Sequence, residues 1–366
     1  MRAETTPVGG GAAARSQHEM TVCNACRYCE AYCPVFQAME DRRTFALGDV
    51  TYLANLCHNC GECLYACQYA PPHEFGIDVP KTFSALRVES YEHAAWPAFA
   101  SEAFRRPWAT TVAALAGSVS IVGLAAAVVS EASDRIGPAD FYAVIPHGVM
   151  VTLFGIAGLF AILALTIGYR QFARSIAGPD WPRPPASSSL GPAARDALTL
   201  KHLHTTGEDC TTAEEVRRPW RRWMHHCTFY GFLLCFASTS VAAIYHLLFG
   251  WIAPYAYTSL PVILGTAGGV GLIIGPAGLF LVDRGRDPAL THQSQAALDA
   301  VFLAMLFLTS ATGLLLLALR EHAVMPSLLV AHLAFVLALF VTLPYGKFVH
   351  GIYRAAALVK FRGEGH

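Results

Sequence analysis

The sequence predicts a mainly α-helical protein, in which a polytopic six-helix membrane bundle follows a small, polar, cysteine-rich domain. Three observations predict this fold class. The chain of 366 residues is 54% hydrophobic and only 14% charged, whereas soluble domains carry about 25% charged residues. Six long apolar runs fill most of the chain after residue 107. Eight of the eleven cysteines lie between Cys23 and Cys67, which indicates a metal-binding segment.

Residues 1–20 are rich in Gly, Ala and Thr and contain no apolar run. We therefore expect a flexible tail here rather than a secretory signal, which needs an apolar core. The cysteine-rich segment should then stay in the cytosol, where thiols are kept reduced. This compartment favours metal ligation over a disulfide framework.

The next segment, residues 21–106, carries the same cysteine spacing twice. The first run is Cys-x2-Cys-x2-Cys-x3-Cys-Pro and the second repeats it with Gln68 in place of the proline. This is the bacterial ferredoxin run, in which the fourth cysteine ligates the other cluster. We therefore predict a bacterial-ferredoxin-like domain with two [4Fe–4S] clusters, and Gln68 affects the local turn rather than the ligation. The first cluster uses Cys23, Cys26, Cys29 and Cys67, and the second uses Cys57, Cys60, Cys63 and Cys33. The alternative is zinc, which prefers four ligands in two CxxC pairs.

The apolar runs that follow cover 108–130, 142–169, 227–251, 260–282, 297–319 and 326–349. Each is longer than the roughly 20 residues that a helix needs to cross a bilayer. We assign 107–169 to transmembrane helices one and two, and 227–350 to helices three to six. Residues 170–226 form a cytosolic insert that contains Cys210 and a basic cluster, and 351–366 form a cytosolic tail. The basic cluster consists of Arg217, Arg218, Arg221 and Arg222.

The loop charges predict the orientation. With a cytosolic N-terminus, the outer loops hold only Arg135 and Arg320, whereas the inner segments hold many more basic residues. This asymmetry follows the positive-inside rule. We expect a multi-pass protein of the cytoplasmic (inner) membrane with both termini in the cytosol. The inner basic residues outside the insert include Arg105, Arg106, Arg284, Arg286, Lys347, Arg354, Lys360 and Arg362.

Histidines in membrane helices are candidates for function, because ionisable groups are costly there. Eighteen residues separate His332 from His350 in the last run, which is about five helical turns and about 27 Å. We expect both on one face of one helix, with His350 at its inner end. The third run has His225 and His226 at its inner end and His246 near its outer end.

Helices three and six run in opposite directions, so these histidines pair by depth. We expect His225 or His226 to meet His350 at an inner haem, and His246 to meet His332 at an outer haem. Such bis-imidazole pairs hold b-type haem in helical bundles. Helical facing angles favour His225 over His226, although fraying at the helix start leaves that choice open. Histidines that hydrogen-bond to neighbours at the interface are the alternative. His147, which follows Pro146 at the start of the second apolar run, is a further candidate haem ligand.

Glycines crowd the fourth apolar run. They permit close helix packing, which is the role we expect, and a flat haem face is the alternative. They are Gly265, Gly268, Gly269, Gly271, Gly275 and Gly278.

Four long strings carry a family resemblance. They are CHNCGECLYACQYAPPHEF at 57–75, HHCTFYGFLLCF at 225–236, LPVILGTAGGVGLIIGPAGL at 260–279 and LPYGKFVHGIYR at 343–354. The chain resembles the tricarballylate/citrate-utilisation protein B family and the matching half of a fused flavoprotein of cobalamin synthesis. The resemblance implies a membrane electron carrier with iron–sulfur clusters and haem. Such a carrier reoxidises the flavin of a partner dehydrogenase and passes electrons to quinone. The bundle is also loosely similar to cytochrome b subunits of respiratory nitrate reductase, by fold analogy alone.

The function expected is therefore electron transfer from an FAD-dependent dehydrogenase to membrane quinone, with no catalytic residues in this chain. Nucleic acid is not an expected partner, because Lys+Arg and Asp+Glu balance at 26 each. One alternative is a redox-sensing transporter, which intramembrane carboxylates would support, and Asp299 is the main one present. Another is a self-sufficient membrane oxidoreductase, which needs a substrate pocket.

Overall fold

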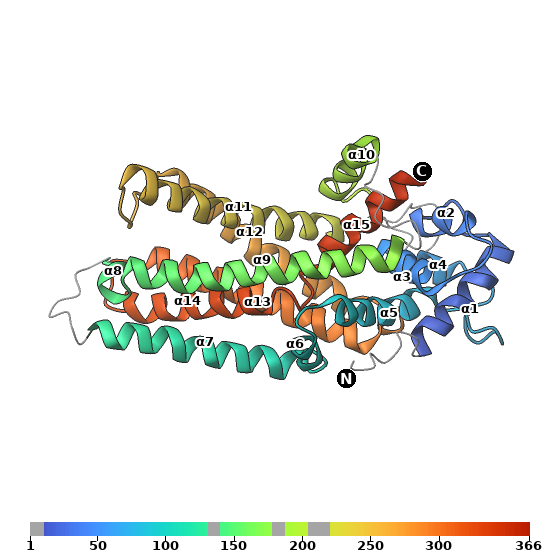
Figure 1. Cartoon of the computed structure of the whole chain (residues 1–366), viewed down its shortest axis with the longest axis horizontal. Helices are drawn as coiled ribbons and strands as arrows, with labels where there is room; N and C mark the ends of the chain where they lie inside the picture. Colours follow the sequence, from blue (N-terminus) through green and yellow to red (C-terminus); the bar gives the residue numbers. More distant parts are fainter. Residues whose placement is uncertain (1–10, 131–139, 178–186, 204–219) are drawn as a thin grey trace.

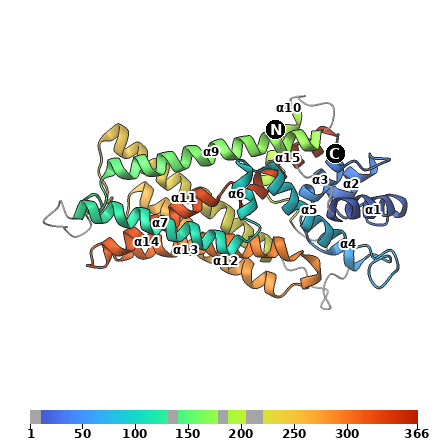
Figure 2. The same ribbon diagram turned by 60° about the horizontal axis from the view of Figure 1, so that its bottom comes forward.

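The computed structural model describes residues 11–130, 140–177, 187–203 and 220–366, and within these ranges every regular element is a helix. Figures 1 and 2 show a long bundle with a compact group of shorter helices, here called the cap, at one end. Six helices are long and apolar enough to cross a membrane, which confirms the predicted fold class. They are α7 (Pro107–Ser130), α9 (His147–Ala177), α11 (Trp220–Phe249), α12 (Leu260–Arg284), α13 (Gln293–Ala318) and α14 (Met325–Thr342).

The bundle helices turn large apolar side chains outward, as a lipid-facing surface requires. Leu124, Leu159 and Leu281 are each about two-thirds exposed or more. Water would penalise such a surface, because burying apolar area is favourable at roughly 25 cal/mol per Å². Hydrocarbon does not, so the outward leucines agree with a membrane location.

Helices α11 and α12 pack closely along their length (Figure 1) because glycines line their contact. A Cβ added at Gly268 would lie 2.8 Å from the backbone nitrogen of Cys235, and one at Gly231 would lie 2.9 Å from the Gly268 carbonyl oxygen. Only hydrogen fits at such positions, and small residues are what let membrane helices approach. The predicted packing role of the glycines is confirmed for this pair of helices.

The cap is built from the N-terminal helices together with the C-terminal helix. Tyr353 of the C-terminal helix stacks on Phe172 of α9 at 4.4 Å between ring centroids, and both are buried in the core of the cap. The cap therefore has no separate core of its own but shares one with the bundle end. The remaining helices are α1 (Gly11–Cys26), α2 (Pro34–Glu40), α3 (Leu47–Leu56), α4 (Glu62–Tyr65), α5 (Val79–Ala94), α6 (Ala98–Ala103), α8 (Phe141–Val144), α10 (Ser187–Leu198), the 3-10 turn η2 (Pro288–Leu290) and α15 (Val349–Gly363).

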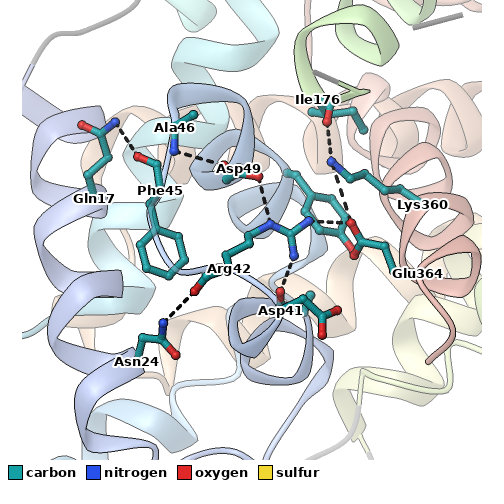
Figure 3. A network of polar contacts seen from close by, with 12 residues as sticks. Gln17, Asn24, Asp41, Arg42, Phe45, Ala46, Asp49, Ile176, Lys360 and Glu364 are labelled. Carbon is teal, nitrogen blue, oxygen red and sulfur yellow. Dashed lines mark hydrogen bonds and ion pairs between the residues drawn. The ribbon is translucent and has the colours of Figure 1, made fainter. Parts of the chain in front are cut away.

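Within the cap, polar contacts join the end of α15 to the N-terminal helices and to the end of α9, as Figure 3 shows. Arg42 donates to Asp49 at 2.9 Å and also pairs with Glu364, the residue that follows α15. Lys360 donates to the backbone carbonyl of Ile176 at the end of α9. These contacts join three segments that are far apart in the sequence.

Where the structure describes the two expected tails, it shows packed helices over residues 11–20 and 351–363. Residues 11–20 belong to α1, where Ser16 and Met20 are fully buried. Residues 351–363 belong to α15, where Phe361 is 2% exposed. The sequence of each segment is polar enough to suggest a tail, but each buries one narrow stripe of side chains against other helices.

The last apolar run is not one helix. Helix α14 ends at Thr342, and α15 begins at Val349 after an irregular stretch that contains Pro344. Proline has no N–H for the helical ladder and clashes with the preceding turn. His332 and His350 are therefore on different helices, and the expectation that one helix carries both is wrong.

The expected insert 170–226 also lies differently from the prediction. Its first residues continue α9, its middle forms α10, and its last residues begin α11. Cys210, Arg217 and Arg218 lie outside the described residues, as does Arg135.

Candidate functional site

The first cysteine run lies where α1 ends and α2 begins. Cys23 and Cys26 occupy the last turn of α1, and Cys33 is the residue that precedes α2, with Pro34 at its first turn. Proline is well suited to that position because its missing N–H has no partner there anyway. The chain between them turns through Arg27, whose φ is 56°. This tight path curls the run around a common centre.

The second run has the same design between α3 and α4. Cys57 follows the last residue of α3, and Cys63 lies within the short helix α4. Gly61 has a φ of 96°, a conformation that suits glycine because it has no Cβ. The loop therefore folds back on itself and turns its thiols inward.

The eight thiols line two neighbouring cavities in the sets of four that the spacing predicts. One cavity is lined by Cys33, Cys57, Cys60 and Cys63. The other is lined by Cys23, Cys26, Cys29 and Cys67, and Cys63 also borders it. In each set the fourth cysteine comes from the other run, as in two-cluster ferredoxins.

The electrostatics of both cavities call for a cation. Burial, with help from neighbouring thiolates, raises the pKa of the Cys29 thiol to about 12. Burial and the adjacent Cys60 and Cys57 thiolates raise the pKa of Cys33 well above its usual value. Four thiolates in one buried site are therefore unstable alone, whereas bound iron would keep them ionised. The residues fit iron–sulfur ligation.

A larger cavity of ≈ 450 Å³ lies between the cap and the end of the bundle that adjoins it. His58 and Asn59, which follow Cys57 directly, line both this cavity and the cavity of the second cysteine set. His225 and His350 line its membrane side. The loop that carries the second cysteine set thus also forms part of the wall of the cavity that holds this histidine pair.

His225 and His350 lie close enough together that both could bind one metal ion between their rings. Their ring centroids are 6.3 Å apart, with the rings 82° from coplanar. Metal–imidazole bonds of about 2 Å on both sides of one iron put the centroids about 6 Å apart. The Nδ1–H of His350 donates to the Lys347 carbonyl at 2.6 Å, which leaves Nε2 free to bind a metal, since such hydrogen bonds commonly orient metal-binding histidines. The Nδ1 atom of His225 is buried without a protein partner.

The charge state of His350 agrees with that role. Burial and the nearby Lys347 and Arg354 lower the pKa of His350 well below its usual value. The imidazole is therefore neutral at physiological pH, which is the form that binds metal.

The other histidines lie elsewhere. His226 stacks on Tyr230 at 5.6 Å, so of the two open choices only His225 meets His350. At the far end of the bundle, His246 stacks on His147 at 3.5 Å between centroids. That spacing is too short for an iron between them in this arrangement.

His332 does not meet His246, contrary to the expected outer pair. Its Nδ1 atom contacts the Thr309 carbonyl at 3.1 Å, and its ring covers Gly313 of α13. Helix α14 packs on α7 and α13, whereas α11 packs on α12, so their outer histidines are held apart.

The sequence identifies Arg221 and Arg354 as basic residues, but it did not lead us to predict that both line one cavity with the histidines. Arg221 precedes His225 by four residues and Arg354 follows His350 by four, a spacing that puts each pair on one helical face. Both arginines line the cavity with the histidines. The i, i+4 spacing was the signal that could have found them.

A helical membrane bundle joined to a cap with eight cysteines in two sets of four defines a membrane-bound iron–sulfur electron-transfer protein. Comparison with known proteins agrees. Residues 15–93 match the family described as citrate utilization protein B Fer4-like domain, and residues 105–366 match citrate utilization protein B. The chain is 47% identical over 354 residues to citrate utilization protein B of Escherichia coli, covering 96% of this chain and 92% of that protein. The chain belongs to the citrate utilization protein B family. No solved structure matches it.

Proposed function

We propose that this protein carries electrons from a reduced FAD-dependent dehydrogenase of tricarballylate- or citrate-type acid utilisation to quinone in the cytoplasmic membrane. The observation that carries the proposal is the shared wall of two cavities. His58 and Asn59 border both the second cysteine set and the cavity of His225 and His350. Redox groups held at both places would be close enough for direct electron transfer.

Each residue set suits one kind of group. The two cysteine sets suit two [4Fe–4S] clusters, and His225 with His350 suits one b-type haem. These groups each accept one electron at a time, and a flavin donor is able to split its electron pair accordingly. The chain itself binds and spaces the groups.

The docking side for the donor is the cap. Its first cysteine set lies away from the bundle, where Tyr28 is 64% exposed beside Cys29. The cap is the cytosolic end in this proposal, since α1 and α15 both lie there (Figure 1) and the positive-inside rule puts the basic segments on that side.

The transporter alternative loses its main support. Asp299, the carboxylate that would serve it, pairs with Lys347 at 2.6 Å. This pair is partly buried, and Lys347 offsets the charge of the carboxylate within the protein. The self-sufficient oxidoreductase needs a substrate pocket, and the cavity of ≈ 450 Å³ is one that it could use, but the two histidines and the loop of the second cysteine set on its walls favour electron transfer.

The test is a reconstituted reaction without oxygen. The purified protein is mixed with the candidate dehydrogenase and its organic acid, and the haem bands are followed by absorption. We expect haem reduction when the acid is added and reoxidation when a soluble quinone follows. A Cys57→Ser variant that keeps its haem serves as the control and should remain oxidised. Haem that stays oxidised beside fully reduced flavin, yet responds to dithionite, would refute the partnership.

A further inference from the structure

Four arginine side chains converge on the loop that carries Cys57. Arg87 of α5 donates to the Ala54 carbonyl at 3.0 Å and to the Cys57 carbonyl at 2.9 Å. Arg354 of α15 donates to the same Cys57 carbonyl at 2.7 Å. Two cations from separate helices thus hold one backbone oxygen next to a cluster ligand.

Two more arginines hold the following residues of the loop. Arg221 of α11 donates to the Asn59 carbonyl at 3.2 Å, and Arg286, which follows α12, donates to the same oxygen. We call Arg87, Arg221, Arg286 and Arg354 the arginine collar. Its members come from α5, from the start of membrane helix α11, from the connection that follows α12, and from α15, so four separate segments of the fold bring them here.

Acidic groups in the same region offset only part of this charge. Asp283 pairs with Arg286 at 3.6 Å, and Asp299 is neutralised by Lys347. Glu62 is buried beside Cys60, and Asp287 lines the cavity. With Lys347 and Arg284 of the cavity wall counted, six cations face these four carboxylates, and the four collar arginines are the cations that hydrogen-bond to the cysteine loop.

The first cysteine set has a different environment. Arg27 lies in its loop but is exposed and donates to the Asn24 carbonyl at 3.1 Å. Glu19, one turn before Cys23 on α1, is buried and paired with Arg15 at 3.1 Å. Among the described residues, the collar, with Arg87 buried and the other three arginines partly buried, therefore belongs to the second set.

Charge of this kind acts on reduction potential. A cluster with four thiolates is anionic, and reduction adds a further negative charge. A nearby cation stabilises the reduced form more than the oxidised form, and hydrogen bonds and net charge are known to set cluster potentials. Buried charges are screened little by salt, so the effect persists under physiological conditions.

We infer that the arginine collar sets the order of reduction of the two sites. It raises the reduction potential of the second site, at Cys33, Cys57, Cys60 and Cys63, above that of the first. An electron that enters the cap therefore reduces the second site, which is the one nearer the membrane bundle. One electron leaves the first site and one arrives at the second, with no bond or proton changed. The four arginines are positioning residues, and the inference rests on the proposed function because it needs a cluster at both sites.

The experiment is a redox titration of the purified full-length protein, with both clusters followed by electron paramagnetic resonance. We expect two midpoint reduction potentials. Arg354→Gln and Arg286→Gln should each lower the higher midpoint by at least about 59 mV, which is a tenfold change in the equilibrium constant of a one-electron couple. Arg354→Lys keeps the charge and should restore most of the shift. Arg27→Gln, on the first loop, is the matched control and should leave the higher midpoint unchanged.

The outcomes separate the inference from the function. Absence of iron and sulfide in the wild-type protein would refute the proposed function itself. Intact clusters with unmoved midpoints in both glutamine variants would overturn the inference alone. If Arg354→Gln loses its cluster, Arg286→Gln, whose side chain lies nearer the surface, decides the matter. Loss of the cluster in both would assign the collar a purely structural role and also overturn the inference.

Discussion

The pairing of His225 with His350 is open to a sharp test because a neighbouring histidine provides a control. We predict that His225→Ala abolishes low-spin haem, while His226→Ala leaves it intact. The two residues are adjacent in α11 but point differently, since His225 lies 6.3 Å from the ring of His350 and His226 stacks on Tyr230.

The size of the effect follows from the ligation geometry. A single iron between the two rings uses one bond from each, so His225→Ala removes half of the axial ligation. Loss of even an outer-shell partner lowers metal affinity about 10–100-fold, so loss of a direct ligand should exceed about 100-fold. His350→Ala should have the same effect, because both residues serve one iron.

The assay is the reduced-minus-oxidised absorption spectrum and the haem content per protein after purification. Circular dichroism should show that the helical content of each variant is unchanged. Equal haem content in His225→Ala and the parent protein would refute the pairing. Loss in His226→Ala but not in His225→Ala would show that the start of α11 is rotated from the arrangement described here.

Three further predictions concern other parts of the molecule. The parent protein should contain about eight non-haem iron atoms and eight sulfides, and Cys60→Ala should lose about four of each; stoichiometric zinc without sulfide would contradict this. Gly268→Ala, whose Cβ would lie 2.8 Å from the backbone of α11, should destabilise by about 1–3 kcal/mol, measured by thermal unfolding in detergent. Gly155→Ala, which meets nothing within 4 Å, should not, and equal effects would refute the close packing. Phe361→Ala removes a side chain that is 2% exposed, and should cost about 3–5 kcal/mol and speed iron loss to a chelator. Phe99→Ala, at 77% exposure, is its control, and unchanged iron release in Phe361→Ala would show that α15 does not support the cap.

Much of this protein was readable from local sequence. The spans follow from hydropathy alone, because a helix must keep about 20 apolar residues in the bilayer wherever its neighbours lie. The two cysteine sets follow from spacing, because three thiols separated by two residues must curl around one centre and send the fourth elsewhere. Neither inference requires knowledge of which helices touch.

The histidine pairs depended on contacts that spacing does not encode. His225 and His350 meet because Pro344 ends α14 and lets α15 turn toward the cap. His246 and His332 do not meet, because α11 packs closely on the glycines of α12 whereas α14 packs on α7 and α13. The prediction required residues 326–349 to form one straight helix that lies beside the third membrane helix. In the structure this run is divided between α14 and α15, and α11 packs mainly on α12.

The arginine collar was the feature most hidden from the sequence. Arg87, Arg221, Arg286 and Arg354 are scattered over nearly the whole chain, and three of them looked like ordinary basic residues flanking membrane helices. Only the folded chain brings them to two carbonyl oxygens of one loop. Local patterns determine what a segment can bind or cross, because those properties depend on neighbours in sequence, whereas the meeting of distant charges depends on how every helix between them packs.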